Sequence, residues 1–134
     1  MARPLLILVV LGLSGCAQTR PAEAPGVVYT LLEMTVHDDA TYQQYREAVA
    51  PIIAAHGGRY LVRAGAERFD ADPSAQTVSP EGDWRPDRII VLKFPSRAAL
   101  DGFVASPEYR AVAPLRAASA TTRSLVVNRY TGDH

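Results

Sequence analysis

Two arginines and a glutamate are the residues whose type and spacing best support chemistry. Arg63 and Arg88 each carry a permanent charge on a planar guanidinium, which can hold a carboxylate or a phosphate through parallel hydrogen bonds. Glu33 lies inside an apolar run, VVYTLLEMTV, where a carboxylate needs a partner. The arginines therefore form either an anion-binding cleft or structural bridges to Glu33, Glu81 or Asp87. Glu33 is also a candidate general base.

Three further residues are candidates for lining a ligand site: His56, Tyr60 and Trp84. His56 is either an acid–base residue or a cation at the end of a predicted helix, where the helix dipole favours positive charge. Trp84 lies in a polar loop and would cover either a pocket or the core. Together with Tyr42, Tyr45 and Tyr60 it could line an apolar cavity, although core packing alone also accounts for all four aromatic residues.

Several classes of function find no support in the sequence. No histidine or carboxylate spacing typical of a metal site occurs, and no glycine-rich nucleotide loop or GxSxG elbow is present. We therefore expect neither a metal nor a cofactor. The 14 basic and 14 acidic residues cancel, which argues against a nucleic-acid partner.

The N-terminal residues predict processing rather than fold. Arg3 precedes an apolar run from Leu5 to Leu13, which is shorter than the about 20 residues that span a bilayer. The sequence Leu13-Ser14-Gly15-Cys16 then resembles a lipobox, in which Cys16 takes a diacylglycerol and becomes the new N-terminus. An ordinary secretory signal with a chance cysteine is the alternative. Ala17, which is not aspartate, predicts the periplasmic face of the outer membrane in a Gram-negative host. The predicted division is a signal peptide (1–15), a tether (16–26) and one domain (27–131).

Apolar runs separated by turn residues predict four strands with helices between them. The strands are expected at 27–36, 59–69, 88–94 and 124–130. Asp38 or Asp39 should cap the first helix, Pro51 should bend or end it, and the glycines at 57 and 58 should close it. A second helix is expected after Ser96 and should restart at Ser106-Pro107. A long loop occupies 70–87.

The order β-α-β-β-α-β predicts an α+β, ferredoxin-like fold: a four-stranded antiparallel sheet with two helices on one face. Alternation along the second strand places Arg59, Leu61 and Arg63 on one side, and Tyr60, Val62 and Ala64 on the other. The first and third strands are apolar on both sides, so the uncovered face needs a partner. A second copy of the same sheet would supply one, and we expect a homodimer.

Separated motifs point to a known family. These are Tyr42-x-x-Tyr45, Pro51, HGGRYLVR at 56–63, EGDWRPDR at 81–88, Phe94-Pro95-Ser96, and SPEY at 106–109 with Arg116. In this order they resemble domain of unknown function 1330. The resemblance implies a dimeric α/β barrel, and it implies no settled activity.

The functional expectation is a lipid-anchored envelope protein that binds a small organic or anionic ligand. The alternatives are a cofactor-free oxygenase or isomerase of the dimeric α/β-barrel type, and a non-catalytic association module. A closed apolar pocket that holds Glu33 or His56 near an arginine would favour an enzyme, whereas a filled interior would favour association. We also expect at least one buried ion pair among Arg63, Arg88 and Glu33, close to a pocket.

Overall fold

The computed structural model describes residues 26–65, 69, 81–130 and 132. The predicted signal peptide, Cys16 and the tether up to residue 25 lie outside the described residues. The elements follow in the order β1 (Val28–Val36), α1 (Asp39–Ala55), β2 (Arg59–Gly65), β3 (Arg88–Phe94), α2 (Arg97–Ala105), α3 (Pro107–Ser119) and β4 (Ala120–Asn128). Across the described ranges, no helix has the length and apolar character needed to cross a membrane.

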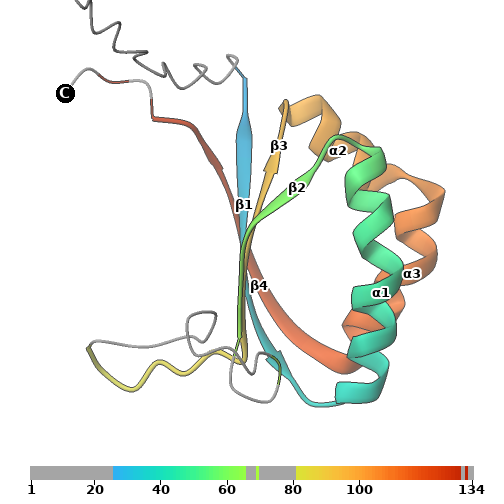
Figure 1. The fold of residues 1–134 in the computed structure, drawn as a ribbon, viewed down its shortest axis with the longest axis vertical. Coiled ribbons are helices and arrows are strands. Elements are labelled where there is room, and N and C mark those ends of the chain that lie inside the picture. The colour runs from blue at the N-terminus through green and yellow to red at the C-terminus, as the bar shows by residue number, and fades with distance from the viewer. Residues whose placement is uncertain (1–25, 66–68, 70–80, 131, 133–134) are drawn as a thin grey trace, which may run out of the picture.

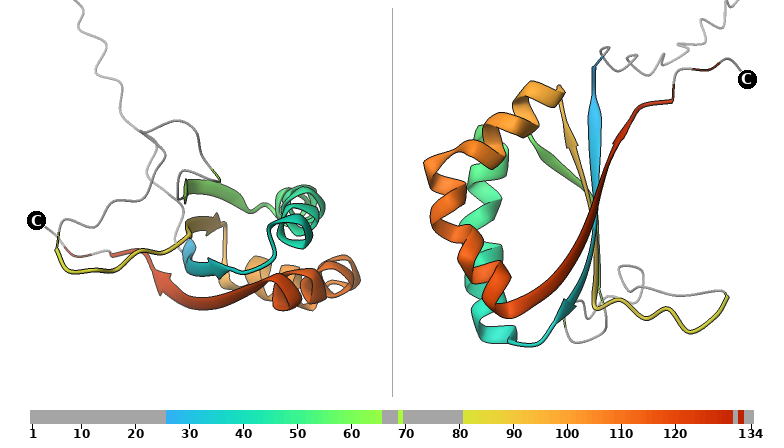
Figure 2. Two further views of the ribbon diagram at one scale, coloured as in Figure 1. Left: turned by 90° about the horizontal axis from the view of Figure 1, so that it is seen from below. Right: turned by 180° about the vertical axis from the view of Figure 1, so that it is seen from behind.

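The four strands form one antiparallel sheet in the order β2-β3-β1-β4. All three helices pack on the same side of this sheet, and the other side carries no helix of the described chain (Figures 1 and 2). The predicted α+β, ferredoxin-like arrangement is therefore confirmed. The expected second helix is divided into α2 and α3, as the Ser106-Pro107 restart predicts.

Serine and aspartate caps set the beginnings of the helices. The Asp38 side chain accepts the Thr41 N–H at 3.0 Å and starts α1. Ser106 acts twice: its hydroxyl accepts the Tyr109 N–H at 3.2 Å and donates to the Phe103 carbonyl at 2.8 Å. One buried hydroxyl thus satisfies a carbonyl at the end of α2 and an N–H group at the beginning of α3.

The turn between α1 and β2 depends on two glycines with different tasks. His56 is the C-cap of α1, and Gly57 follows with a φ of 73°, the left-handed conformation that closes a helix. Gly58 is needed for close approach instead, since a Cβ there would lie 2.6 Å from the Phe94 ring and 2.8 Å from Ile53. The helix runs through Pro51 and does not end there, contrary to one of the expected outcomes.

Two strand boundaries differ from the sequence prediction. The second strand ends at Gly65, and Phe69 lies in a turn beyond it. The fourth strand begins at Ala120 rather than Ser124 and ends at Asn128. Apolar runs guided the predicted limits, but backbone pairing with β1 sets the real ones, and it extends β4 through its polar first half.

The pairing register also corrects the predicted faces of β2. A register shift lies between Tyr60 and Val62, so Tyr60 pairs with Leu92 and Arg63 pairs with Ile90. Leu92 and Ile90 both belong to the core beneath the helices. Tyr60 and Arg63 therefore share the helix side, and the prediction that they face opposite ways is wrong. A bulge inserts one residue and reverses the alternation after it.

The core lies between the sheet and the helices. It is built from alternate residues of β1 and β3 and from one face of α1, α2 and α3: Val28, Met34, Val36, Tyr42, Tyr45, Val49, Ile53, Ile90, Leu92, Phe94, Leu100, Phe103, Tyr109 and Ala120. The opposite side of the sheet, here called the open face, presents apolar side chains to solvent, among them Leu31, Val62, Leu125 and Val127.

Candidate functional site

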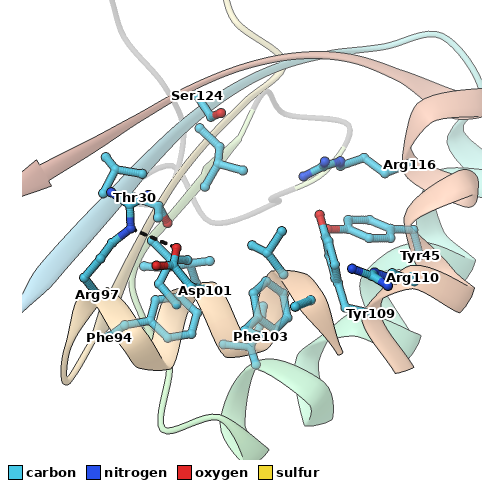
Figure 3. Close-up of a pocket in the computed structure, with 17 residues that line it drawn as sticks. Thr30, Tyr45, Phe94, Arg97, Asp101, Phe103, Tyr109, Arg110, Arg116 and Ser124 are labelled. Carbon is cyan, nitrogen blue, oxygen red and sulfur yellow. Dashed lines mark hydrogen bonds and ion pairs between the residues drawn. The ribbon is translucent and has the colours of Figure 1, made fainter. Parts of the chain in front are cut away.

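A cleft of about 470 Å³ lies between the sheet and the helices α2 and α3 (Figure 3). Its wall is largely apolar and comes from both layers: Leu32, Ile53, Leu92, Phe94, Leu100, Phe103, Val104 and Val126. The volume falls within the range of about 300–1,000 Å³ that is common for small-molecule sites. The cleft is therefore large enough to hold a small organic molecule.

One end of the cleft combines a cation with two phenols. The Arg116 guanidinium lies 5.8 Å from the centre of the Tyr45 ring and 5.9 Å from that of Tyr109. Such stacking holds a guanidinium in place while its N–H groups stay available to an acceptor. Within the described residues, no carboxylate lies at ion-pair distance from Arg116. This end of the cleft is therefore a positively charged position in an apolar enclosure.

The tyrosine beside this cation is held neutral. Burial raises the pKa of the Tyr45 phenol, and the nearby Arg116 charge offsets only part of that rise. The hydroxyl is consequently a hydrogen-bond donor at neutral pH, like the guanidinium next to it. Two kinds of donor thus face the same end of the cleft (Figure 3).

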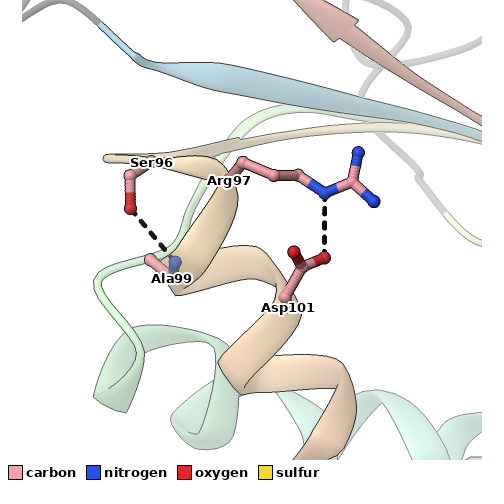
Figure 4. A network of polar contacts seen from close by, with 4 residues as sticks. All are labelled: Ser96, Arg97, Ala99 and Asp101. Atoms are coloured by element: carbon pink, nitrogen blue, oxygen red, sulfur yellow. Dashed lines mark hydrogen bonds and ion pairs between the residues drawn. The ribbon is translucent and has the colours of Figure 1, made fainter.

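The other end of the cleft is polar in a different way. Arg97 and Asp101 form an ion pair of 2.8 Å along the first turns of α2, which Ser96 caps through the Ala99 N–H (Figure 4). Both charged side chains are largely exposed, so this pair contributes little to stability. Nearby, the Thr30 hydroxyl is buried in the cleft wall and has no hydrogen-bond partner in the part of the chain that the structure describes. A ligand atom could satisfy it.

Three of the residues singled out in the sequence line a second, smaller cavity of about 30 Å³ between α1 and the sheet. Arg63, Arg88 and Tyr60 meet there together with Arg46 from α1. The Arg63 guanidinium lies 4.9 Å from the centre of the Tyr60 ring. Arg88 is only 1% exposed and lies over the ring of Phe69. The structure therefore brings the two predicted arginines together.

Glu33 and Trp84 lie on the open face, away from both cavities. The Trp84 Nε1–H donates to Glu33 Oε1 at 3.0 Å, and Arg123 lies 3.8 Å from Glu33 Oε2. Glu33 is opposite Ile89 in the register, while Arg88 is opposite Met34, so the two charges point to opposite sides of the sheet. The predicted ion pair of Glu33 with Arg63 or Arg88 is wrong for this reason.

His56 lies at the end of α1, away from the cleft and from the small cavity. It caps α1, and its ring packs edge-on against Phe103 at 6.0 Å. It borders a shallow surface groove with Pro51 and Glu108, a groove to which no arginine contributes. Neither His56 nor Glu33 therefore lies in a closed pocket near Arg63 or Arg88, the arrangement that would favour an enzyme. Tyr42 and Tyr45 belong to the core and also line the small cavity, and Tyr45 lines the cleft as well, so both expected roles are present. The Tyr42 hydroxyl contacts Met34 Sδ at 3.1 Å.

From the sequence, Tyr45 is a candidate cavity-lining residue, whereas Tyr109 and Arg116 stand out only as members of the family motifs and not as site residues. Tyr109 and Arg116 are seven residues apart, so they lie two turns apart on one face of α3, and this spacing was the available signal. Tyr45 comes from α1 and Thr30 from β1, and no local pattern connects them. Across the described ranges, no group of three metal-ligating side chains is present.

The fold and the cleft define a ferredoxin-like α+β protein whose helix layer covers one side of its sheet. The chain belongs to the family described as domain of unknown function (DUF1330), which matches residues 27–130. A comparison with curated proteins found no match.

Solved structures of similar fold come from several bacteria. A protein of unknown function from Rhodopseudomonas palustris is 17% identical, with a TM-score of 0.63 over 80% of this chain and 85% of that one. SnoaB, a cofactor-independent oxygenase from Streptomyces nogalater, is 17% identical, with a TM-score of 0.52 over 80% of this chain and 96% of that one. A dimeric ferredoxin-like protein of unknown function from Jannaschia sp. CCS1 is 15% identical, with a TM-score of 0.53 over 78% of this chain and 100% of that one. At these identities the likeness concerns the fold.

Proposed function

We propose that the protein is a lipid-anchored envelope protein that binds a small organic anion in the cleft between the sheet and α2 and α3. The observation that carries this proposal is Arg116, a guanidinium held against two tyrosine rings in an apolar cleft, with no carboxylate partner among the described residues. Arg116 is half-buried, so it loses part of its hydration, and an anionic ligand would compensate for that loss.

The chemistry of the cleft indicates the shape of the ligand. A carboxylate at the Arg116 end would accept hydrogen bonds from the guanidinium and from the Tyr45 hydroxyl. The body of the ligand would lie against Phe94 and Phe103, whose rings are 5.5 Å apart in the cleft wall. A polar atom at its far end would reach the Thr30 hydroxyl. An aromatic or cyclic carboxylic acid meets these conditions.

A thermal-shift screen with matched acids and amides tests the binding. Aromatic carboxylates such as benzoate and naphthoate should raise the melting temperature, while the corresponding amides should not. Arg116→Gln should weaken the binding of an active acid by about 10- to 100-fold, because it removes a charge-assisted contact. Arg85→Gln, which changes an exposed loop arginine, is the control with the same change in charge. Equal shifts by acids and amides, or an unaffected Arg116→Gln variant, would contradict the proposal.

The anchoring part of the proposal is supported by the sequence Leu13-Ser14-Gly15-Cys16 that follows the apolar run. Cys16→Ser should leave the full-length protein without lipid and release it from the membrane fraction. Ala17 predicts that the wild type fractionates with the outer membrane of a Gram-negative host. Mature wild-type protein that retains Arg3, or that is found in the soluble periplasmic fraction, would refute lipid anchoring.

The proposed assembly is a homodimer through the open face. Leu31, Val62 and Leu125 are exposed there on three different strands, and an apolar sheet face of this kind is normally covered. Structures of similar fold from Jannaschia and from Bacteroides fragilis are described as dimeric. The cleft lies on the opposite side of the sheet, so dimer formation leaves it accessible.

A cofactor-free oxygenase is the second candidate, and the same cation favours it. Arg116, beside the rings of Tyr45 and Tyr109, could stabilise the anion of an easily ionised substrate, which is the species that reacts with oxygen when no cofactor takes part. One of the similar folds is described as such an oxygenase. An oxygen electrode separates the two functions: consumption of oxygen with a bound polycyclic phenol supports the oxygenase, and tight binding without consumption supports the binding protein.

A further inference from the structure

One residue of the cleft wall is polar where its neighbours on the same strand are apolar. Thr30 of β1 lies opposite Leu92 and Val126 in the register, both of which line the cleft. The alternation of β1 turns it to the helix side together with four apolar residues: Val28, Leu32, Met34 and Val36. A valine has nearly the same shape and would complete this apolar row, so the hydroxyl group is the feature to be explained.

The Thr30 hydroxyl is both buried and unpaired. Thr30 is 7% exposed, and its Oγ1 has no hydrogen-bond partner within the described residues. A buried hydroxyl without a partner is unfavourable, because it has given up its hydrogen bonds to water and gained none in return. A ligand that brings a polar group to this point removes that cost. Thr30 therefore favours ligands with a polar group at its end of the cleft.

The charged pair at the same end of the cleft indicates which polar group fits. Arg97 and Asp101 line the cleft with Thr30 (Figure 3), and Arg97 contacts Asp101 through its Nε (Figure 4). A guanidinium only donates hydrogen bonds, a carboxylate only accepts them, and a threonine hydroxyl does both. A ligand hydroxyl can donate and accept, so all three groups suit it. A second carboxylate on the ligand would meet an arginine that Asp101 already neutralises.

We propose that this end of the cleft is a subsite for a hydroxyl group, and that Thr30 determines the specificity for it. The inference rests on the proposed function, which places a carboxylate at Arg116. Because Arg116 and Thr30 lie at opposite ends of the cleft (Figure 3), the two groups belong on opposite ends of the ligand. The ligand is then an aromatic acid whose hydroxyl group is remote from its carboxylate.

Three matched acids test this specificity in the wild type. They are naphthoate, a naphthoate with a hydroxyl group on the remote ring, and a naphthoate with a hydroxyl group next to the carboxylate. Calorimetric titration should show that the remote hydroxyl tightens binding by about 3- to 10-fold, the contribution of one hydrogen bond. The adjacent hydroxyl should bring no gain. Equal affinities for all three acids would overturn the inference.

Variants of Thr30 locate the effect. Thr30→Val removes the hydroxyl at nearly constant shape, so it should bind plain naphthoate as the wild type does and lose the preference for the remote hydroxyl. Thr30→Ser, which keeps the hydroxyl, should keep the preference. Thr35→Val makes the same change at an exposed position of β1 and should leave every affinity unchanged. A preference that survives in Thr30→Val would assign the hydroxyl to another residue and contradict the proposal.

The ligand-free protein provides a second test, which does not depend on Arg116. Thr30→Val should melt about 3–8 °C above the wild type, because it removes an unpaired buried hydroxyl. A melting temperature at or below that of the wild type would show that the hydroxyl has a partner in the free protein, and would overturn the inference.

Naphthol, which has no carboxylate, separates this inference from the proposed function. It should stabilise the wild type and Arg116→Gln alike, and Thr30→Val less. If acids and amides bind equally well while naphthol still distinguishes Thr30→Val, the organic-anion proposal fails and the hydroxyl subsite stands. If acids are preferred to amides while naphthol stabilises the wild type and Thr30→Val equally, the hydroxyl subsite fails alone.

Discussion

Single residues decide whether the two layers of this protein can meet, and Gly58 is the clearest case. A Cβ at this position would lie inside contact distance of Phe94 and Ile53, both in the core. Gly58→Ala should lower the free energy of unfolding by about 1–3 kcal/mol through overpacking. Urea denaturation measures the change.

Gly102 provides the matched control for this prediction. It lies within α2, and a Cβ there would approach nothing more closely than His56 Nδ1 at 3.8 Å. Gly102→Ala should therefore be neutral or stabilise the protein by about 0.5–1 kcal/mol, as alanine does within helices. Equal effects of the two substitutions would contradict the close approach at Gly58.

The buried phenols predict how stability depends on alkaline pH. Burial raises the pKa of Tyr45 above 10.0, the value expected in the unfolded chain. Above about pH 10 the unfolded chain binds fewer protons than the folded chain, so the free energy of unfolding decreases as the pH rises. Below about pH 9 the Tyr45 phenol is protonated in both states, so it does not make the free energy of unfolding depend on pH.

Tyr45→Phe isolates that contribution. The free energies of unfolding of the wild type and the variant should run parallel near neutral pH. Above about pH 10 they should draw together or cross, because only the wild type has to keep this phenol protonated to stay folded. Burial raises the pKa of Tyr42 and of Tyr60 as well. The free energy of unfolding of the variant should therefore still decrease at alkaline pH, although less steeply. Curves that stay parallel throughout would show that the Tyr45 hydroxyl is hydrated.

At the scale of elements, the junction of α2 and α3 depends on the one hydroxyl of Ser106. It is buried and takes part in two hydrogen bonds, one to each helix. Ser106→Ala should reduce the free energy of unfolding by about 1–2 kcal/mol. Ser124→Ala, at an exposed position in β4, should change it by less than about 0.5 kcal/mol. Similar values for both would mean that Pro107 alone sets the start of α3.

The helices and strands show which features can be predicted from residues that are neighbours in the sequence. Capping residues, turn glycines and apolar periodicity depend on neighbours in the sequence, and they predicted the order of helices and strands and the restart at Ser106. The bulge in β2 depends on pairing with β3, so alternation within β2 could not reveal it. The same cause made the predicted faces of Arg63 and Tyr60 wrong.

The candidate sites show the same division. Arg63 and Arg88 were singled out from their chemistry, and the register brings them to one cavity with an unexpected third arginine, Arg46. Arg116 and Tyr45 become neighbours only when α3 packs beside α1. Glu33 had the opposite outcome: its apolar neighbours predicted an ion pair with Arg63 or Arg88, but it lies on the open face, where its carboxylate accepts a hydrogen bond from Trp84.

At the scale of the whole molecule, the two sides of the sheet differ in what covers them. The side covered by the helices (Figure 2) holds the core, the cleft and the small cavity that Arg46, Arg63 and Arg88 line, and the open face carries exposed apolar residues. Leu31→Asp places a charge on that face and should convert the proposed dimer of the domain 27–131, produced without the residues before it, to a monomer in sedimentation velocity.

Val104→Asp is the control for this change. Val104 is exposed on α2, on the far side of the sheet from Leu31, and the substitution brings the same charge. It should leave the dimer intact. A wild-type domain that sediments as a monomer at micromolar concentration would contradict the proposed assembly.

The position of Trp84 gives the protein a built-in optical probe. It is the single tryptophan of the chain, and it is 57% exposed. Its indole N–H donates a hydrogen bond to Glu33 on the open face. Its fluorescence should therefore shift to shorter wavelength when a partner excludes water from that face. A ligand that enters the cleft on the other side of the sheet should leave the emission almost unchanged. One spectrum can thus distinguish association of two copies from occupation of the cleft, without any added label.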